Sequence, residues 1–187
     1  MTTQQVLFIQ GAGQGAHDED QHLAESLRRT LGPRYQIRYP VMPNEDDAPY
    51  EEWRNKIEME IDDLSGPVVL VGHSVGASVL MKWLCERGAG KSVVGVFLAA
   101  CAFWGGEGWR YEGYKVLALP AGFAARLPEG MPVYLYHCRD DATVPFDHLE
   151  LYQRVLPQAI VRAFDDGGHQ FNDDLSAVAR DIKALTS

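Results

Sequence analysis

The sequence lacks three features that would place it in large classes of proteins: a long apolar run, an excess of positive charge and a regular set of cysteines. No stretch approaches the roughly 18 consecutive apolar residues of a membrane-spanning helix, so we expect no membrane segment. The formal net charge is −9, from 17 Lys and Arg against 26 Asp and Glu. This balance argues against nucleic acid or an anionic membrane surface as a partner.

The three cysteines are odd in number, far apart in the chain and without the spacing of metal ligands. We therefore expect Cys85, Cys101 and Cys138 to be buried thiols, with no metal site. The first ten residues, MTTQQVLFIQ, have no basic region, and their apolar run is only four residues long. This pattern is unlike a secretory signal and predicts a cytoplasmic location.

Apolar runs rich in Val, Ile, Leu and Phe recur along the chain, and several are continuous rather than alternating. Continuous runs are typical of strands in a parallel sheet that helices cover on both faces. The predicted strands are 6–9, 36–40, 67–73, 93–101, 132–138 and 159–165. Amphipathic helical patterns lie between them at 18–32, 49–64, 75–88 and 173–186. This alternation predicts a single α/β domain over residues 1–187.

The connection between the fourth and fifth predicted strands, residues 102–131, is unusually long and rich in glycine and aromatic residues. It leaves the carboxyl end of a strand, where ligands bind in open α/β sheets, and long connections are often lids or binding loops. We favour a lid or pocket segment over the alternative, an ordinary crossover helix with packing aromatics. The aromatic residues that we predict to line a substrate pocket here are Phe103, Trp104 and Trp109.

The third predicted strand runs directly into Gly72-His73-Ser74-Val75-Gly76, and an amphipathic helix follows. The pattern G-x-S-x-G in a strand–turn–helix context is typical of a nucleophilic serine at the tip of a sharp turn. The two glycines let strand and helix approach closely, and the helix N-terminus favours developing negative charge. We predict that Ser74 is the nucleophile and that His73 is a packing or hydrogen-bonding residue.

A serine hydroxyl needs a base to remove its proton, and the base needs a carboxylate to orient it. The candidate base is His169, in the Gly-Gly-His loop after the last predicted strand. Two acids follow the fifth strand in DDATVP (140–145). We prefer Asp141, because Asp141 to Pro145 resemble the D-x-x-V-P acid loop of many serine hydrolases, in which the rigid proline helps to hold the turn. Asp140 is kept as the alternative.

A second glycine-rich stretch, VLFIQGAGQGA (6–16), contains the first predicted strand and the turn after it. In this turn Gly11, Gly13 and Ala16 fit the dinucleotide-binding spacing G-x-G-x-x-G/A. A dinucleotide site needs an acid at the end of the second strand, where this chain has Tyr39 and Pro40. The carboxylates of Asp-Glu-Asp (18–20) would repel a pyrophosphate at the helix N-terminus. Arg38 leaves a contact with a 2′-phosphate open.

An acyl-transfer enzyme uses such a turn differently, because its tetrahedral intermediate carries an oxyanion that needs two preorganised N–H donors. We predict that the donors are the backbone N–H groups of Ala12 and Val75. The substrate pocket is predicted to take further residues from this turn and from later loops. These are Gly11, Gln14, Phe146 and Phe171.

The motifs QGAG (10–13), GHSVG (72–76), DDATVP (140–145) and GGHQF (167–171) occur in this order over nearly the whole chain. With them, the chain resembles the α/β-hydrolase superfamily and, by its small size, the compact serine hydrolases of the retinoblastoma-binding-protein type. Many members have histidine where this chain has Gln10. The resemblance implies a three-layer αβα sandwich with a six-stranded parallel sheet in the order 2-1-3-4-5-6.

The predicted function is hydrolysis of a carboxylic ester through a Ser-His-Asp triad and an acyl-enzyme, with a small-molecule acyl substrate and no cofactor. Ester, thioester, amide and lactone hydrolysis share this apparatus, so the sequence leaves the bond open. Two other classes of protein are considered: a non-catalytic binding protein on the same scaffold and a nucleotide-dependent oxidoreductase. The complete set of candidate Ser, Asp and His residues argues against the first of these.

Overall fold

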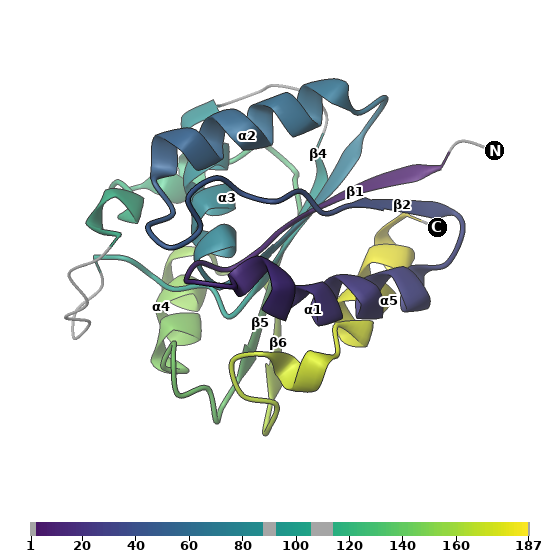
Figure 1. Ribbon diagram of the computed structural model, residues 1–187. Helices are drawn as coiled ribbons and strands as arrows, with labels where there is room; N and C mark the ends of the chain where they lie inside the picture. Colours follow the sequence, from purple (N-terminus) through teal and green to yellow (C-terminus); the bar gives the residue numbers. More distant parts are fainter. Residues whose placement is uncertain (1–2, 88–92, 106–113, 187) are drawn as a thin grey trace.

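A parallel sheet with helices on both faces organises the chain in the computed structural model, which describes residues 3–87, 93–105 and 114–186 (Figure 1). The strands are β1 (Gln4–Ile9), β2 (Tyr35–Arg38), β3 (Val68–His73), β4 (Val93–Ala99), β5 (Val133–Cys138) and β6 (Ile160–Phe164). They form a 6-stranded sheet in the order β2-β1-β3-β4-β5-β6, and every neighbouring pair is parallel. The predicted fold class and strand order are confirmed.

The helices connect successive strands or follow the last of them. They are α1 (Ala16–Leu31), α2 (Tyr50–Asp63), α3 (Ser74–Arg87), α4 (Asp147–Val155) and α5 (Ser176–Thr186), with 3₁₀ turns η1 (Lys115–Leu117), η2 (Phe123–Arg126) and η3 (Phe171–Asp173). The largest difference from the predicted boundaries is at the last helix, which was expected from residue 173. It begins at Ser176 because Asp174 accepts the Ser176 N–H at 2.8 Å and caps the first turn.

Two apolar layers sandwich the sheet, one on each face. In β1, Val6 and Phe8 pack into the layer formed with α1 and α5, whereas Leu7 and Ile9 pack into the layer formed with α2, α3 and α4. Figure 1 shows these two groups of helices on opposite sides of the strands. Burial on both faces explains the continuous apolar runs of the central strands. The edge strand β6 has no fully buried residue.

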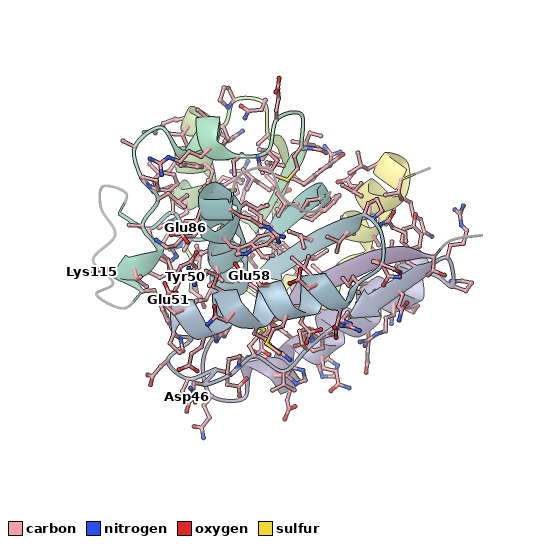
Figure 2. All side chains as sticks on the ribbon, turned by 90° about the horizontal axis from the view of Figure 1, so that it is seen from above. Asp46, Tyr50, Glu51, Glu58, Glu86 and Lys115 are labelled. Atoms are coloured by element: carbon pink, nitrogen blue, oxygen red, sulfur yellow. The ribbon has the colours of Figure 1, made fainter. Side chains whose placement is uncertain are left out.

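The loop before α2 is anchored to the α2–α3 layer and reaches the carboxyl edge of the sheet. The Trp53 indole N–H donates to the Pro43 carbonyl at 2.8 Å. Tyr50 donates a hydrogen bond to Glu86 of α3, and Figure 2 shows these two side chains next to each other. These contacts fix the position of the loop that carries Asp46.

The described parts of the long connection, residues 102–105 and 114–131, contain two 3₁₀ turns rather than a crossover helix. Leu117 and Phe123 are buried in the core, so part of the segment packs against the domain as an ordinary connection does. Trp109 lies outside the described residues, and the role of the segment as a lid stays a prediction.

The three cysteines are buried free thiols, as predicted. Burial raises the pKa of Cys85 and Cys101 to about 11 and that of Cys138 to about 12. Thiols with such pKa values are protonated and unreactive near neutral pH.

Among the described helices, none is long and apolar enough to cross a membrane.

Candidate active site

A sharp turn at the end of β3 presents Ser74 at the carboxyl edge of the sheet. Its φ of 52° is in the left-handed region, which a serine adopts only under strain. A Cβ added to Gly72 would lie 2.7 Å from the Ala77 Cα, and one added to Gly76 would lie 2.1 Å from the Gln10 carbonyl oxygen. Both glycines are therefore required by direct backbone contact, which is the close approach expected from the sequence pattern.

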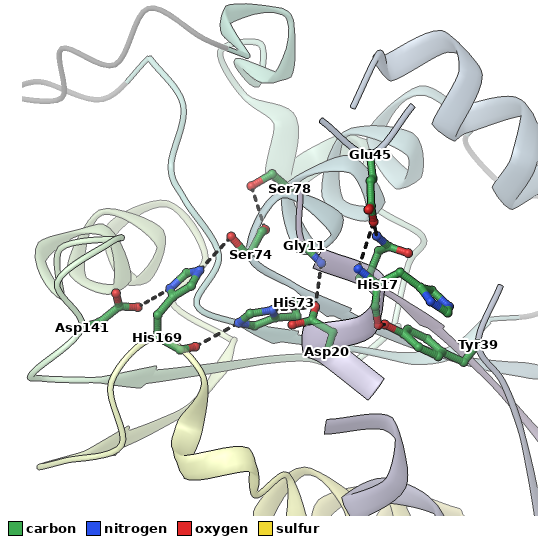
Figure 3. A network of polar contacts seen from close by, with 11 residues as sticks. Gly11, His17, Asp20, Tyr39, Glu45, His73, Ser74, Ser78, Asp141 and His169 are labelled. Carbon is green, nitrogen blue, oxygen red and sulfur yellow. Dashed lines mark hydrogen bonds and ion pairs between the residues drawn. The ribbon is translucent and has the colours of Figure 1, made fainter. Parts of the chain in front are cut away.

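Ser74, His169 and Asp141 come from three different loops and converge at this turn (Figure 3). The His169 Nε2 lies 3.0 Å from the Ser74 Oγ, and its Nδ1 lies 2.8 Å from the Asp141 Oδ2. The other oxygen of Asp141 accepts the backbone N–H groups of Thr143 and Val144 at 2.8 and 2.9 Å. In this geometry an imidazole can take a proton from the hydroxyl while the carboxylate fixes its tautomer.

The protonation states suit that proton transfer. Burial raises the pKa of Asp141, but hydrogen bonds from His137 and His169 outweigh it and hold this pKa well below its usual range. Burial also lowers the pKa of His169; the hydrogen bond from its ring to Asp141 opposes this effect, and the electrostatic interaction with His73 adds to it. Asp141 is therefore ionised and His169 neutral near pH 7, as a carboxylate and a base at such a site must be.

The two acids between which the sequence left a choice have different partners. Asp140 is exposed, and its carboxylate accepts the backbone N–H groups of Gly168 at 2.8 Å and Gly167 at 3.2 Å. Asp141 contacts the imidazole of His169 itself. Asp140 thus shapes the loop that carries His169, and Asp141 is the carboxylate that faces its ring.

A cavity of about 270 Å³ opens beside Ser74. Its described walls are Ala12, Gly13, Asp46, Ser74, Val75, Ala102, Trp104, Tyr114, Thr143 and Val144. In the described part of the chain the Ala12 N–H has no backbone acceptor. Val75 lies in the first turn of α3, where N–H groups lack partners within the helix. Ala12 and Val75, the predicted oxyanion donors, thus line the same cavity as Ser74, and their role stays a prediction.

A second cavity, also of about 270 Å³, meets the first at Ala12, Ser74 and Thr143. Its described walls include Gly11, Ala16, Glu19, Asp20, His73, His169 and Gln170. Most of these residues are polar, whereas the first cavity has mainly apolar walls. The serine therefore stands between two spaces of different chemical character. Gly11 and Trp104, two of the predicted pocket residues, are among their walls.

Four predicted pocket residues are not among the described walls of either cavity. They are Gln14, Phe103, Phe146 and Phe171. Gln14 is exposed. The ring of Phe103 packs against Tyr152, that of Phe146 against Arg139 and that of Phe171 against Phe164. A loop aromatic packs on the nearest apolar surface, which the sequence does not specify, and a role of these residues in substrate binding stays a prediction.

Glu45 organises the loop after β1, and no motif in the sequence pointed to it. Its carboxylate accepts the Gln10 side-chain amide at 2.7 Å and the N–H groups of Gly15 and His17 at 2.8 and 2.9 Å (Figure 3). Gln10 thereby holds the loop where many hydrolases have histidine. A carboxylate of the protein itself also occupies the N-terminus of α1, where a dinucleotide pyrophosphate would bind. This contact argues against the oxidoreductase hypothesis.

The strand order and the serine at the β3–α3 turn are those of the α/β-hydrolase fold. The chain belongs to the serine hydrolase family, whose model matches residues 9–175. No curated protein sequence matches the chain significantly.

Several solved structures share the fold at low sequence identity. The ydeN gene product of B. subtilis is 20% identical, with a TM-score of 0.75 over 98% of this chain and 99% of that chain. An esterase from Exiguobacterium antarcticum is 16% identical, with a TM-score of 0.69 over 100% and 93%. The meta-cleavage product hydrolase from Pseudomonas fluorescens IP01 is 15% identical, with a TM-score of 0.74 over 99% and 91%. At these identities the likeness concerns the fold alone.

Proposed function

We propose that the protein is a serine esterase, which hydrolyses carboxylic esters through an acyl-enzyme. The observation that carries the proposal is the pair of contacts from His169, at 3.0 Å to the Ser74 Oγ and at 2.8 Å to the Asp141 Oδ2. Membership of the serine hydrolase family supports hydrolytic chemistry. The narrower resemblance to hydrolases of the retinoblastoma-binding-protein type stays a prediction.

The proposed reaction has two halves. First, the His169 Nε2 takes the proton of Ser74 as its Oγ attacks the ester carbonyl carbon, and the Ala12 and Val75 N–H groups hold the oxyanion. His169 then gives this proton to the leaving alcohol as the C–O bond breaks. In the second half, a water molecule gives a proton to His169 as it attacks the acyl carbonyl carbon. His169 then returns this proton to the Ser74 Oγ as the bond between Oγ and the acyl carbon breaks, which releases the acid and restores the serine. Asp141 stabilises the imidazolium in both halves.

The two cavities support a small substrate with an apolar acyl group on one side of Ser74 and a polar alcohol on the other. Each cavity has an exposed carboxylate in its wall, Asp46 in the apolar one and Glu19 in the polar one. Neither has a lysine or arginine among its described walls. An anionic ester meets repulsion on both sides, so we propose that neutral or cationic esters are the substrates.

Labelling with a fluorophosphonate tests the proposed function. The Ser74 Oγ is expected to displace fluoride and form one phosphonyl adduct, located by mass spectrometry on the peptide that contains residue 74. Hydrolysis of p-nitrophenyl acetate or butyrate by the same preparation should disappear as the adduct forms. An adduct on another serine contradicts the assignment. The absence of both adduct and hydrolysis favours a non-catalytic binding protein.

Selection by charge is tested with two esters of equal acyl length, one neutral and one ending in a carboxylate. In Asp46→Asn the ratio of kcat/KM for the anionic ester to that for the neutral ester is expected to rise about fivefold at low salt. Two like charges a few ångströms apart in water repel by about 1 kcal/mol, which is a factor of about five. The matched control is Asp47→Asn, an exposed neighbour that is not a described wall of either cavity. An equal ratio in both variants contradicts the charge argument.

A further inference from the structure

His73 is a buried histidine whose two ring nitrogens both face oxygen atoms that can only accept (Figure 3). Its Nδ1 lies 2.8 Å from the Asp20 Oδ2, and its Nε2 lies 2.9 Å from the backbone carbonyl oxygen of His169. A neutral imidazole carries one N–H and therefore satisfies one of these acceptors, whereas an imidazolium satisfies both.

The second contact of Asp20 identifies which partner holds the proton. The same Oδ2 atom that faces His73 accepts the backbone N–H of Gly11 at 2.7 Å. An oxygen that takes two N–H donors is that of an ionised carboxylate, and both side chains are 1% exposed. Two charges buried together in this way are stable only as a pair.

We propose that His73 is a permanently protonated positioning residue, which forms a buried ion pair with Asp20 and joins the oxyanion loop to the loop of the catalytic histidine. On one side, Asp20 holds the N–H of Gly11, which directly precedes the oxyanion donor Ala12. On the other side, His73 holds the backbone of His169. One ion pair thereby sets the distance between two parts of the site that belong to opposite ends of the chain.

The charge of His73 also acts on the base. The rings of His73 and His169 have centroids 4.8 Å apart, so a proton on the first disfavours a proton on the second. The titratable groups that face His73 are Asp20 from α1, His169 from the loop after β6 and Asp141 from the loop after β5. Burial lowers the pKa of His73, but the charge of Asp20 outweighs it and raises that pKa above the ordinary value. His73 thus stays charged in the pH range where His169 has to be neutral.

The first test is independent of any activity. In the intact protein labelled with ¹⁵N-histidine, NMR is expected to show protons on both ring nitrogens of His73 throughout pH 6–8. The His73→Gln variant assigns the signal by its loss, and correlation from the backbone of the unchanged protein assigns it if that variant does not fold. A neutral tautomer at His73 overturns the proposal.

The second test measures the pKa of His169 by the same NMR titration. Removal of the neighbouring positive charge in His73→Gln is expected to raise the pKa of His169 by about one unit. The double variant Asp20→Asn/His73→Gln removes both charges and should shift it less, and His22→Gln, on the exposed side of α1, should leave it unchanged. An unchanged pKa of His169 in folded His73→Gln overturns the proposal.

The consequence for catalysis rests on the proposed function. Because His169 is a base only when neutral, the acid limb of kcat/KM should move to higher pH by the same amount in His73→Gln. A merely structural role of His73 would lower kcat/KM equally at pH 6 and pH 8. If the unchanged protein hydrolyses no ester, the esterase proposal fails, while the two NMR readings still decide the ion pair.

Discussion

Replacement of Ser74 by alanine is expected to lower kcat/KM for p-nitrophenyl butyrate by on the order of 10⁴-fold or more, because no nucleophile remains to form the acyl-enzyme. The residual rate comes from the oxyanion donors and from binding, which the substitution leaves in place. The rate is measured from p-nitrophenol release at substrate concentrations well below KM. The fluorophosphonate adduct should disappear as well.

Ser78 provides the matched control, because it is a second serine on the same face of α3. Its hydroxyl lies 3.2 Å from the Ala102 carbonyl and 3.5 Å from the Ser74 carbonyl, to which it can donate, and it is buried away from the imidazole. The Ser78→Ala variant should therefore be labelled fully by the fluorophosphonate, and its kcat/KM should stay within a few-fold of that of the unchanged protein. A folded Ser74→Ala variant that is as active as the unchanged protein would contradict the assignment of the triad.

Asp141→Asn is expected to lower kcat by about 10⁴-fold while the substrate still binds. The Asn side-chain amide donates to the His169 Nδ1 where the carboxylate accepted, which places the ring proton on Nε2. An Nε2–H faces the Ser74 Oγ and cannot take its proton. The measurement is kcat from the full dependence of rate on substrate concentration, with circular dichroism to verify folding.

Asp140→Asn is the adjacent control and decides the choice that the sequence left open. Its oxygen still accepts one of the two glycine N–H groups that hold the His169 loop, so kcat should fall by less than about tenfold. A larger loss in Asp140→Asn than in Asp141→Asn would mean that the loop rearranges and that the acids exchange roles.

Periodicity in the sequence predicted the six strands and four of the described helices, whereas α4 (Asp147–Val155) was not among the helical patterns. The continuous apolar runs of β1, β3, β4 and β5 reflect burial on two faces, which is a property that each residue carries locally. The edge strand β6 was also predicted to within one residue at each end, at 159–165 against Ile160–Phe164, although none of its residues is fully buried. The strand order came from resemblance to a family, because periodicity alone does not say which strands are neighbours.

In the candidate site, too, features set by residues adjacent in sequence were predictable, whereas features set by distant segments were not. The turn around Ser74 was predictable, because two glycines and a strand–helix boundary are adjacent in sequence and the backbone contact there is local. The positions of the predicted pocket aromatics depend on distant segments, on which Phe103, Phe146 and Phe171 pack, and their role in a pocket stays a prediction. Glu45 had no sequence signal, because an isolated acid in a loop shows nothing of the three donors that it accepts.

The sequence by itself determined the class of fold, the serine at the tip of the turn and the histidine and acids that are candidates to serve it. Only the tertiary structure decided which of two adjacent acids faces His169 and that His73 lies between Asp20 and the His169 backbone. Helix and strand patterns depend on neighbours a few residues away, which the sequence contains. A contact between groups 53 or 96 residues apart, such as those of His73 with the Asp20 carboxylate and the His169 backbone carbonyl, depends on where the folded backbone brings them, to within about an ångström.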